Sequence, residues 1–413
     1  MRQYSITRVL GLPEYKIEEI LSESESAIHL RVVAYKRKPF ICSACGCEHD
    51  GVDHDRVEVV AEDRRLIGRR VYLHVMKRRR RCPKDGRMRV EAVAWLKPLA
   101  RVTDRFAEDV YRLTAIATNV EAGWYLGLDD EKVYRIDRER LEGLFKERLE
   151  PPPAVVNMSV DEVSWLKYYR YVTNVIDVDL RKVIWNGRGR KAEVLDKYYR
   201  GIGKNNCGKI ESVALDGART YISSTENNAT NALIVYDKFH VVQRLNSTVD
   251  AVRKIELNKA RKEERGDLVE MMGCKQRFVL LKNKSKLTEK QSEHLNQLCA
   301  VNEPIYKAML LKESFLEVYT KPDEDSAKEC LNAWITQAAA SGIKIFHELA
   351  EKFKTKAQYI LNWFRKRISS AISEGINNKI KRLKRMAYGY RDVGYFLLKI
   401  HQHCGLLNPR LSQ

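Results

Sequence analysis

The sequence of 413 residues predicts a multidomain α/β protein in which an all-helical insertion interrupts a mixed-sheet core. Three short apolar runs, at 154–160, 210–215 and 232–236, have the length and composition of buried strands, and an aspartate follows each run. By contrast, the long stretch 243–345 is polar and has helical character throughout. The three prolines at 151–153 cannot continue a helix, so they mark the clearest domain boundary.

The composition indicates a polyanionic partner. Lys and Arg number 75 against 55 Asp and Glu, which gives a net charge of +20, and such a balance most often accompanies nucleic-acid binding. The chain has no run of about 18 apolar residues and no apolar signal segment at its N-terminus, so we expect no membrane partner. Four of the nine cysteines lie close together, a pattern that favours a metal site in a reducing cytoplasm over disulfides.

Residues 1–95 predict a small β-rich module. The segments 27–34 and 71–75 alternate apolar and polar residues, as half-buried strands do. The run 77–81 consists of five adjacent cations, which repel one another unless an anion lies near. We therefore expect phosphate contacts from this run, the alternative being a solvated charged surface. The candidates are Arg78, Arg79 and Arg80.

The same module carries a candidate zinc site. The spacing of Cys42 and Cys45 lets two thiolates reach one tetrahedral Zn²⁺, and Cys82 supplies a third thiolate. A second Cys-x-x-Cys pair would need a cysteine at position 85, where the chain has Asp85, so the fourth ligand stays open. The candidates for it are Asp85, Cys47, His49 and His54. The alternative is a degenerate knuckle held together by its apolar core.

Residues 96–150 predict a helix-turn-helix domain. Thr103 can cap a first helix, a short second helix covers 120–126, and Asp129 can cap a third helix after a tight turn. A helix, a tight turn and a basic helix form the pattern whose later helix lies in the major groove of DNA. The alternative is an ordinary three-helix bundle. The cations expected largely on the outer face of the third helix are Lys132, Arg135, Arg138 and Arg140, and the first three are the candidates for DNA contact.

The segment 151–245 predicts the first part of the α/β core. Asp161, Asp216 and Asp237 each follow an apolar strand, and the end of a strand puts its side chain at the rim of the sheet. These carboxylates could therefore converge at one site. An aspartate after a strand is also common as a helix cap, so each residue has a structural alternative.

A helical insertion is expected at 246–345, followed by the C-terminal part of the core at 346–413. Aromatic residues within 343–369 predict one long helix with a buried face. A further helix contains Glu374 near its start and a run of cations after it. Its polar face could hold phosphates beside a metal ion, or it could be a solvated basic helix whose glutamate offsets the helix dipole. The cations are Lys379, Lys381, Arg382, Lys384 and Arg385.

Four segments resemble the insertion-sequence transposases of the ISL3 family. They are VDEVSW around Asp161, VALDGARTY around Asp216, YDKFHVVQ at 236–243 and EGINNKIKRLKRMAYGYRD from Glu374. The N-terminal cysteines and the helix-turn-helix follow the same order, so the resemblance spans nearly the whole chain. Two positions depart from the family pattern, because Asp85 stands where a fourth cysteine is usual and Gly217 where a methionine is frequent.

The resemblance implies an RNase H-like core with a DDE triad of Asp161, Asp216 and Glu374, and Asp237 is the rival ligand. It implies two Mg²⁺ or Mn²⁺ ions, because phosphoryl transfer can use a pair of hard cations that clamp the attacking and leaving oxygens. The implied activity is metal-dependent cleavage and strand transfer of double-stranded DNA, at terminal inverted repeats and at a target, by a dimer in a prokaryotic cytoplasm. The alternatives are an inactive, transposase-derived DNA-binding regulator and an RNase H-like nuclease without strand transfer.

Overall fold

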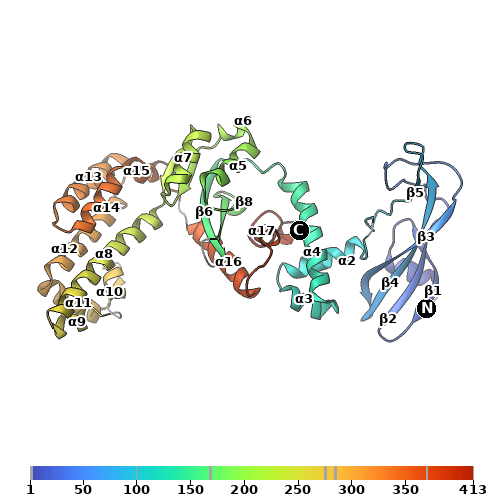
Figure 1. Ribbon diagram of the computed structural model, residues 1–413, viewed down its shortest axis with the longest axis horizontal. Coiled ribbons are helices and arrows are strands. Elements are labelled where there is room, and N and C mark those ends of the chain that lie inside the picture. Colours follow the sequence, from blue (N-terminus) through green and yellow to red (C-terminus); the bar gives the residue numbers. More distant parts are fainter. Residues whose placement is uncertain are drawn as a thin grey trace. The chain divides into compact units, whose positions relative to one another are not determined.

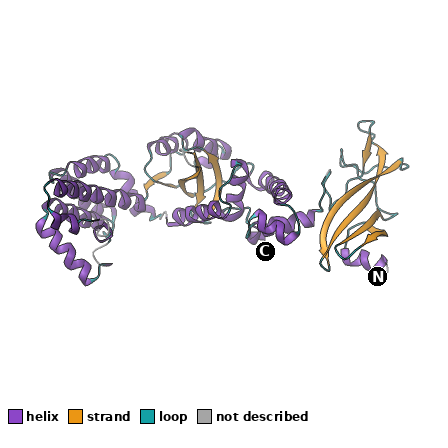
Figure 2. Ribbon diagram, turned by 60° about the horizontal axis from the view of Figure 1, so that its bottom comes forward, coloured by secondary structure: helices purple, strands orange, loops and turns teal. Residues whose placement is uncertain are grey.

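The computed structural model describes residues 3–98, 100–166, 170–273, 277–282, 286–368 and 371–412. These residues form two five-stranded sheets and many helices (Figure 1; strands are orange in Figure 2). It divides into two compact units, one formed by Met1–Leu144 with Pro409–Gln413 and the other by Phe145–Asn408. Among the described residues, no helix has the length and apolar character needed to cross a membrane.

The first sheet lies in the N-terminal unit and has the strand order β1-β2-β4-β3, with β5 paired to β4. Strands β2 and β4 are parallel, and the other pairs are antiparallel. The strand predicted at 27–34 is confirmed as β2, whereas the one predicted at 71–75 extends through the cationic run as β4. The elements are α1 (Gln3–Leu10), β1 (Tyr15–Glu23), β2 (Ala27–Ala34), β3 (Asp55–Leu66), β4 (Arg69–Arg81) and β5 (Met88–Val90).

Three helices follow in the chain, and their ends agree with the capping pattern of the sequence. The side chain of Thr103 accepts a hydrogen bond from the backbone N–H of Phe106, and Thr118 forms a capping box with Glu121. Asp129 Oδ1 accepts from the N–H of Lys132 at 2.7 Å, so the predicted cap of the third helix is confirmed. The helices are α2 (Asp104–Thr114), α3 (Asn119–Leu126) and α4 (Asp130–Leu149).

The second sheet has the order β10-β9-β6-β7-β8. Strands β6, β7 and β8 pair antiparallel, while β9 and β10 run parallel to β6. One expectation was wrong: Asp161 lies in the middle of β6, because pairing with β7 continues past it to Leu166. The strands are β6 (Asn157–Leu166), β7 (Arg170–Asp177), β8 (Lys182–Arg188), β9 (Ser212–Leu215) and β10 (Leu233–Tyr236).

Helices cover both faces of this sheet (Figure 1). Alternation along β6 sends Val163 toward one helical layer, which contains Ile376 and Ile380, and Val160 toward the other, which contains Tyr199. The predicted apolar spacing of the Glu374 helix is therefore confirmed. The first layer comprises α16 (Ala371–Met386) and α17 (Val393–Cys404), and the second comprises α5 (Ala192–Ile202), α6 (Lys204–Cys207) and α7 (Arg219–Asn228).

The region between β10 and α16 has helices as its only regular elements within the described residues, and the first of these helices begins at Lys238. Its core includes Phe315, whose ring lies 4.8 Å from that of Trp334 and 5.1 Å from that of Phe353, centroid to centroid. The helices are α8 (Lys238–Lys262), α9 (Gly266–Met271), α10 (Arg277–Leu281), α11 (Glu289–Val301), α12 (Glu303–Val318), α13 (Glu324–Ala340), α14 (Lys344–Lys354) and α15 (Ala357–Lys366).

The long helix expected at 343–369 is instead two helices, α14 and α15. The chain leaves helical geometry at Lys356, with φ −115° and ψ 13°. This break lets α15 pack on β10, where Asn362 Nδ2 donates to the carbonyl of Ile234 at 2.8 Å. The expectation of a buried aromatic face is nevertheless confirmed, because Phe346 and Phe353 are buried.

Candidate active site

A cleft of about 630 Å³ lies where the second sheet meets the helical region. The sheet side supplies carboxylates, and the helical side supplies cations and hydroxyl groups. The sheet contributes Asp161, Glu162, Asp216 and Tyr236 to the lining. Helix α8 contributes His240, Gln243, Arg244, Ser247 and Thr248, and α14 with the turn after it contributes Leu349, Lys352, Phe353 and Lys356.

Asp161 is fixed by hydrogen bonds to both of its carboxylate oxygens. Oδ1 accepts from the backbone N–H of Glu162 at 2.7 Å, and Oδ2 accepts from Nδ2 of Asn377 at 2.6 Å. Burial raises the pKa of Asp161, and the negative charge of Asp216 adds to the rise, against the opposite effects of the Glu162 N–H, His240 and Asn377. A cation close to both carboxylates would relieve this repulsion.

Asp216 directly follows β9, and its Oδ1 accepts from the N–H of Ala218 at 2.8 Å. The next residue, Gly217, has φ +80°, and a Cβ there would lie 2.6 Å from Cζ of Tyr236. Only glycine fits this conformation and this contact without strain. The ring of Tyr236 thus fills the space that a side chain at 217 would need.

Glu374 lies in the first turn of α16 and is exposed. It is not among the residues that line the cleft, so the structure brings Asp161 and Asp216 to one cleft without adding Glu374 to its walls. The same helix nevertheless contacts β6 on both sides of Glu374. Ser373 Oγ donates to Ser159 Oγ at 2.7 Å, and Asn377, one turn further on, reaches Asp161.

Asp237 is 3% exposed and caps α8, because its Oδ1 accepts from the N–H of Phe239 at 2.9 Å. Its Oδ2 lies 3.6 Å from Nε2 of His240, whose ring lines the cleft. Asp237 itself is outside the lining. In this structure Asp237 therefore caps the start of α8 and helps to position His240 in the cleft.

Several residues of the cleft were not expected from the sequence. Glu162 accepts a hydrogen bond from Oη of Tyr221 at 3.1 Å, and its pKa is raised, chiefly by burial. The only feature of the sequence that pointed to Glu162 was its position next to Asp161. The contribution of α8 had a clearer signal, since Arg244 and Thr248 follow His240 of the segment 236–243 at helical spacing.

Comparison with known proteins decides the family. The model of the ISL3-type DDE family, described as transposase, matches residues 158–400, more than half of the chain. The chain belongs to the ISL3 family of DDE transposases. It is 32% identical over 382 residues to the transposase for insertion sequence element IS1001 of Bordetella parapertussis, covering 91% of this chain and 90% of the relative. The transposase for IS1557 of Mycobacterium tuberculosis (strain CDC 1551 / Oshkosh) is 27% identical over 438 residues, covering 96% of each.

The protein is accordingly an insertion-sequence transposase, an enzyme that binds DNA and transfers its phosphoryl groups. DDE transposases use divalent metal ions, and hard oxygen ligands of the kind that Asp161 and Asp216 offer suit such ions. The resemblance seen in the sequence is confirmed for the family and for the reaction class.

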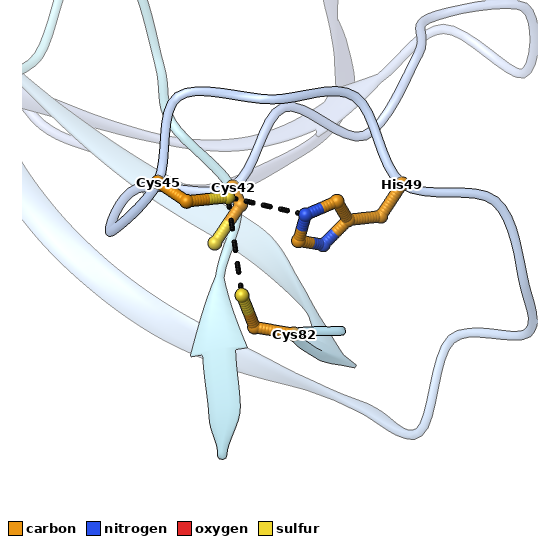
Figure 3. Close-up of side chains that lie close together, drawn as sticks. All are labelled: Cys42, Cys45, His49 and Cys82. Carbon is orange, nitrogen blue, oxygen red and sulfur yellow. Dashed lines mark hydrogen bonds between the residues drawn. The ribbon is translucent and has the colours of Figure 1, made fainter. Parts of the chain in front are cut away.

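The N-terminal unit of the transposase contains a cluster that could hold zinc. The potential ligand atoms of Cys42, Cys45, His49 and Cys82 all lie within 4.8 Å of one another (Figure 3). Sγ of Cys45 lies 3.1 Å from Nε2 of His49 and 3.8 Å from Sγ of Cys82. Three thiolates and one imidazole are an established tetrahedral ligand set for Zn²⁺.

Asp85 lies outside this cluster. Its Oδ2 accepts two hydrogen bonds from the guanidinium of Arg89, at 2.9 Å and 2.6 Å, and its Oδ1 accepts from the N–H of Arg87. Among the four candidates for the last ligand, the structure therefore brings His49 to the three cysteines and gives Asp85 another partner.

The cationic run on β4 is largely neutralised within the fold. The guanidinium of Arg78 is buried and donates to Glu91 at 2.8 Å and 3.0 Å. Arg79 pairs with Asp55 at 3.0 Å, and Arg80 pairs with Asp53 at 2.7 Å. These carboxylates are the partners of the three arginines within the fold.

The remaining predicted DNA-binding cations differ in whether they are already paired within the fold or exposed to solvent. On α4, Lys132 pairs with Glu62 and Arg138 with Glu142, each at 2.8 Å, whereas Arg135 is exposed. On α16, Lys384 Nζ donates to the carbonyl of Ser164 at 2.9 Å. The exposed cations of that helix are Lys379, Lys381, Arg382 and Arg385.

Proposed function

We propose that this transposase cuts DNA at the ends of its insertion sequence and joins them to target DNA at a single site built on an RNase H-like sheet. The observation that carries the proposal is that Asp161 and Asp216, from the adjacent parallel strands β6 and β9, face one cleft. The sheet order supports it, since three antiparallel strands are followed by two parallel strands added beside the first.

Asp161 and Asp216 would hold the divalent metal, and Glu374 is the third carboxylate of the set. The donor atoms fit a hard cation, because both aspartates offer carboxylate oxygens and the negative charge of Asp216 helps to raise the pKa of Asp161. Two Mg²⁺ or Mn²⁺ ions, when bound, supply the positive charge that activates water and stabilises the leaving oxygen.

The protein's own groups orient this set. Asn377 and the N–H of Glu162 each hold one oxygen of Asp161, and the N–H of Ala218 holds Asp216. Asp237 is better suited to a positioning role than to a metal ligand, because it is buried and already caps α8.

DNA recognition belongs, in this proposal, to the segments before residue 151. A zinc-bound module at 1–95 and a helix-turn-helix at 96–150 bind the terminal repeats, with Arg135 reaching the bases. The exposed cations of α16 hold the DNA backbone beside Glu374. The catalytic core consists of residues 151–245 and 346–413, and the helical insertion lies between these two parts. A dimer would bring the two ends together in the bacterial cytoplasm, where the DNA lies.

The test uses the full chain, a labelled duplex carrying the element's end, and Mg²⁺. Asp161→Asn, Asp216→Asn and Glu374→Gln should each lower cleavage and joining at least about a hundredfold, which corresponds to about 2.7 kcal/mol of transition-state stabilisation. DNA affinity should stay equal or rise slightly, because an anion has been removed.

Asp237→Asn is the matched comparison, and it should keep a larger share of the activity. If Asp237→Asn is inactive while Asp216→Asn cuts normally, the second carboxylate is Asp237. If Glu374→Gln cuts at the wild-type rate, the three-carboxylate assignment is wrong and α16 only grips DNA.

A further inference from the structure

Two cations of the helical region lie against the loop that carries Asp216. Nη2 of Arg244, on α8, lies 3.4 Å from the carbonyl oxygen of Asp216 and donates to it. Nζ of Lys356, in the turn between α14 and α15, donates to the carbonyl oxygen of Gly217. Both hydrogen bonds are to neutral carbonyls. Within the described part of the chain, neither cation forms an ion pair with a carboxylate.

The ring of Tyr236 holds both cations. The guanidinium carbon of Arg244 lies 5.9 Å from the ring centroid, and Nζ of Lys356 lies 5.3 Å from it. The ring itself is 2% exposed and packs against Gly217, so its position is fixed. Two like charges held by one ring repel each other, and an anion placed between them and solvent would stabilise both.

A third cation, Lys352, lines the same side of the cleft from α14. Ser247 and Thr248 line it too, but their hydroxyls donate to the carbonyls of Gln243 and Arg244, one turn earlier in α8. The carboxylates line the opposite, sheet side of the same cleft. This division suits a DNA strand, whose phosphate oxygens accept hydrogen bonds from arginine and lysine.

We propose that Arg244 and Lys356 form a phosphate-binding site in the cleft, which holds a phosphate group of the DNA strand adjacent to the phosphate that is cut. The inference rests on the proposed function of the cleft. It makes the helical region part of the active site, because a phosphate held there fixes the neighbouring phosphate in front of Asp161 and Asp216. Positioning of this kind is a large part of the rate enhancement in phosphoryl transfer.

The experiment replaces single phosphates near the cleavage site by uncharged methylphosphonates and measures binding and cleavage by the full-length protein. With the wild-type chain, one neutral linkage next to the cut should lower affinity and slow cleavage at least about tenfold. In the double variant Arg244→Gln/Lys356→Gln, cleavage should already be slow, and that same linkage should slow it no further. The log–log slope of affinity against salt should become shallower by about 0.9 for each phosphate that the variant no longer neutralises.

The matched control is Lys354→Gln, because Lys354 is exposed on α14 and does not line the cleft. This variant should keep both the sensitivity to the neutral linkage and the salt slope of the wild type. The conservative variant Lys356→Arg keeps the positive charge and should retain most of the phosphate binding. Thermal melting of each variant shows whether the fold is kept. If the neutral linkages slow the double variant by the same factors as the wild type at every position, the two cations do not bind a phosphate and the inference fails.

An Asp161→Asn background separates this outcome from a failure of the proposed function. The weaker binding caused by the neutral linkage should persist in that variant even though cleavage is abolished. If Asp161→Asn cleaves normally, the carboxylate assignment fails, whatever the two cations prove to bind.

Discussion

Nδ2 of Asn377 donates a hydrogen bond of 2.6 Å to Oδ2 of Asp161, across 216 residues of sequence. The bond joins α16 to the middle of β6, so the helix that carries Glu374 is tied to the strand that carries Asp161. Because the amide donates to the charged form of the carboxyl group, it favours the ionised state of Asp161.

Removing this bond should change how cleavage depends on pH. In Asn377→Ala the pKa of Asp161 rises further, so protons compete better for the carboxylate and the acid limb of the pH–rate profile moves to higher pH. We expect a larger loss of cleavage at pH 6 than at pH 8. The neighbouring Asn378, which is exposed, provides the control variant Asn378→Ala. An equal loss at every pH would mean that Asn377 serves packing alone.

The zinc content of the protein should depend on His49 and should not depend on Asp85. His49→Ala and Cys42→Ser each remove one of four ligand atoms, so the purified full-length protein should lose zinc and melt at a lower temperature. Asp85→Asn and His54→Ala should keep close to one zinc per chain, as measured by elemental analysis. Loss of zinc in Asp85→Asn, with retention in His49→Ala, would reverse the assignment.

Specific DNA binding should depend on Arg135 more than on Arg138. Arg135 is exposed near the start of α4, whereas Arg138 already pairs with Glu142. In the proposed helix-turn-helix, α4 is the recognition helix, and the N-terminal part of such a helix contacts base edges. Arg135→Ala should weaken binding to the terminal repeat by about 1–3 kcal/mol and affect unrelated DNA less. Arg148→Ala, near the other end of the helix, is the control. Equal losses on both DNAs would mean that Arg135 touches only the backbone.

The stability of the fold should fall in acid because of His401. This residue on α17 is fully buried, and burial lowers its pKa from 6.5 to about 4. Between these values the unfolded chain binds a proton that the folded chain does not, so the free energy of unfolding decreases as pH falls from 6.5 toward 4, by up to about 1.4 kcal/mol per pH unit.

His401→Gln, which does not titrate, should flatten the dependence of melting temperature on pH in this window. The exposed His347 provides the control variant His347→Gln, which should leave the dependence unchanged. If both variants keep the wild-type slope, the loss in acid comes from other groups.

Features that depend on neighbours in sequence could be predicted. The caps at Thr103 and Asp129 follow from side chains that reach N–H groups three residues away, and the apolar spacing of Ile376 and Ile380 gives α16. The aspartate that follows β9 was likewise visible as the end of an apolar run. Sequence patterns of this local kind were sufficient to suggest the family and the order of the elements.

Features that depend on distant partners could not be predicted. The extent of β6 past Asp161 is set by pairing with β7, and the break at Lys356 by packing of α15 on β10. His49 lies with Cys42, Cys45 and Cys82 because its loop folds back on them. The spacing of residues along the sequence did not distinguish His49 from the other candidates for the fourth ligand. The pairing of Arg78 with Glu91 likewise depends on a residue of the segment that follows the next turn.

The hydrogen bond between Asn362 and Ile234 has a consequence for how the molecules behave in solution. Strand β10 is the outermost strand of its sheet, and an outer strand exposes carbonyls on which a strand of another molecule can pair. The amide of Asn362 already occupies the carbonyl of Ile234, and α15 packs along the same strand. The helical region therefore shields this edge of the sheet from intermolecular strand addition, and a variant that loosens α15 should aggregate before its catalytic groups are disturbed.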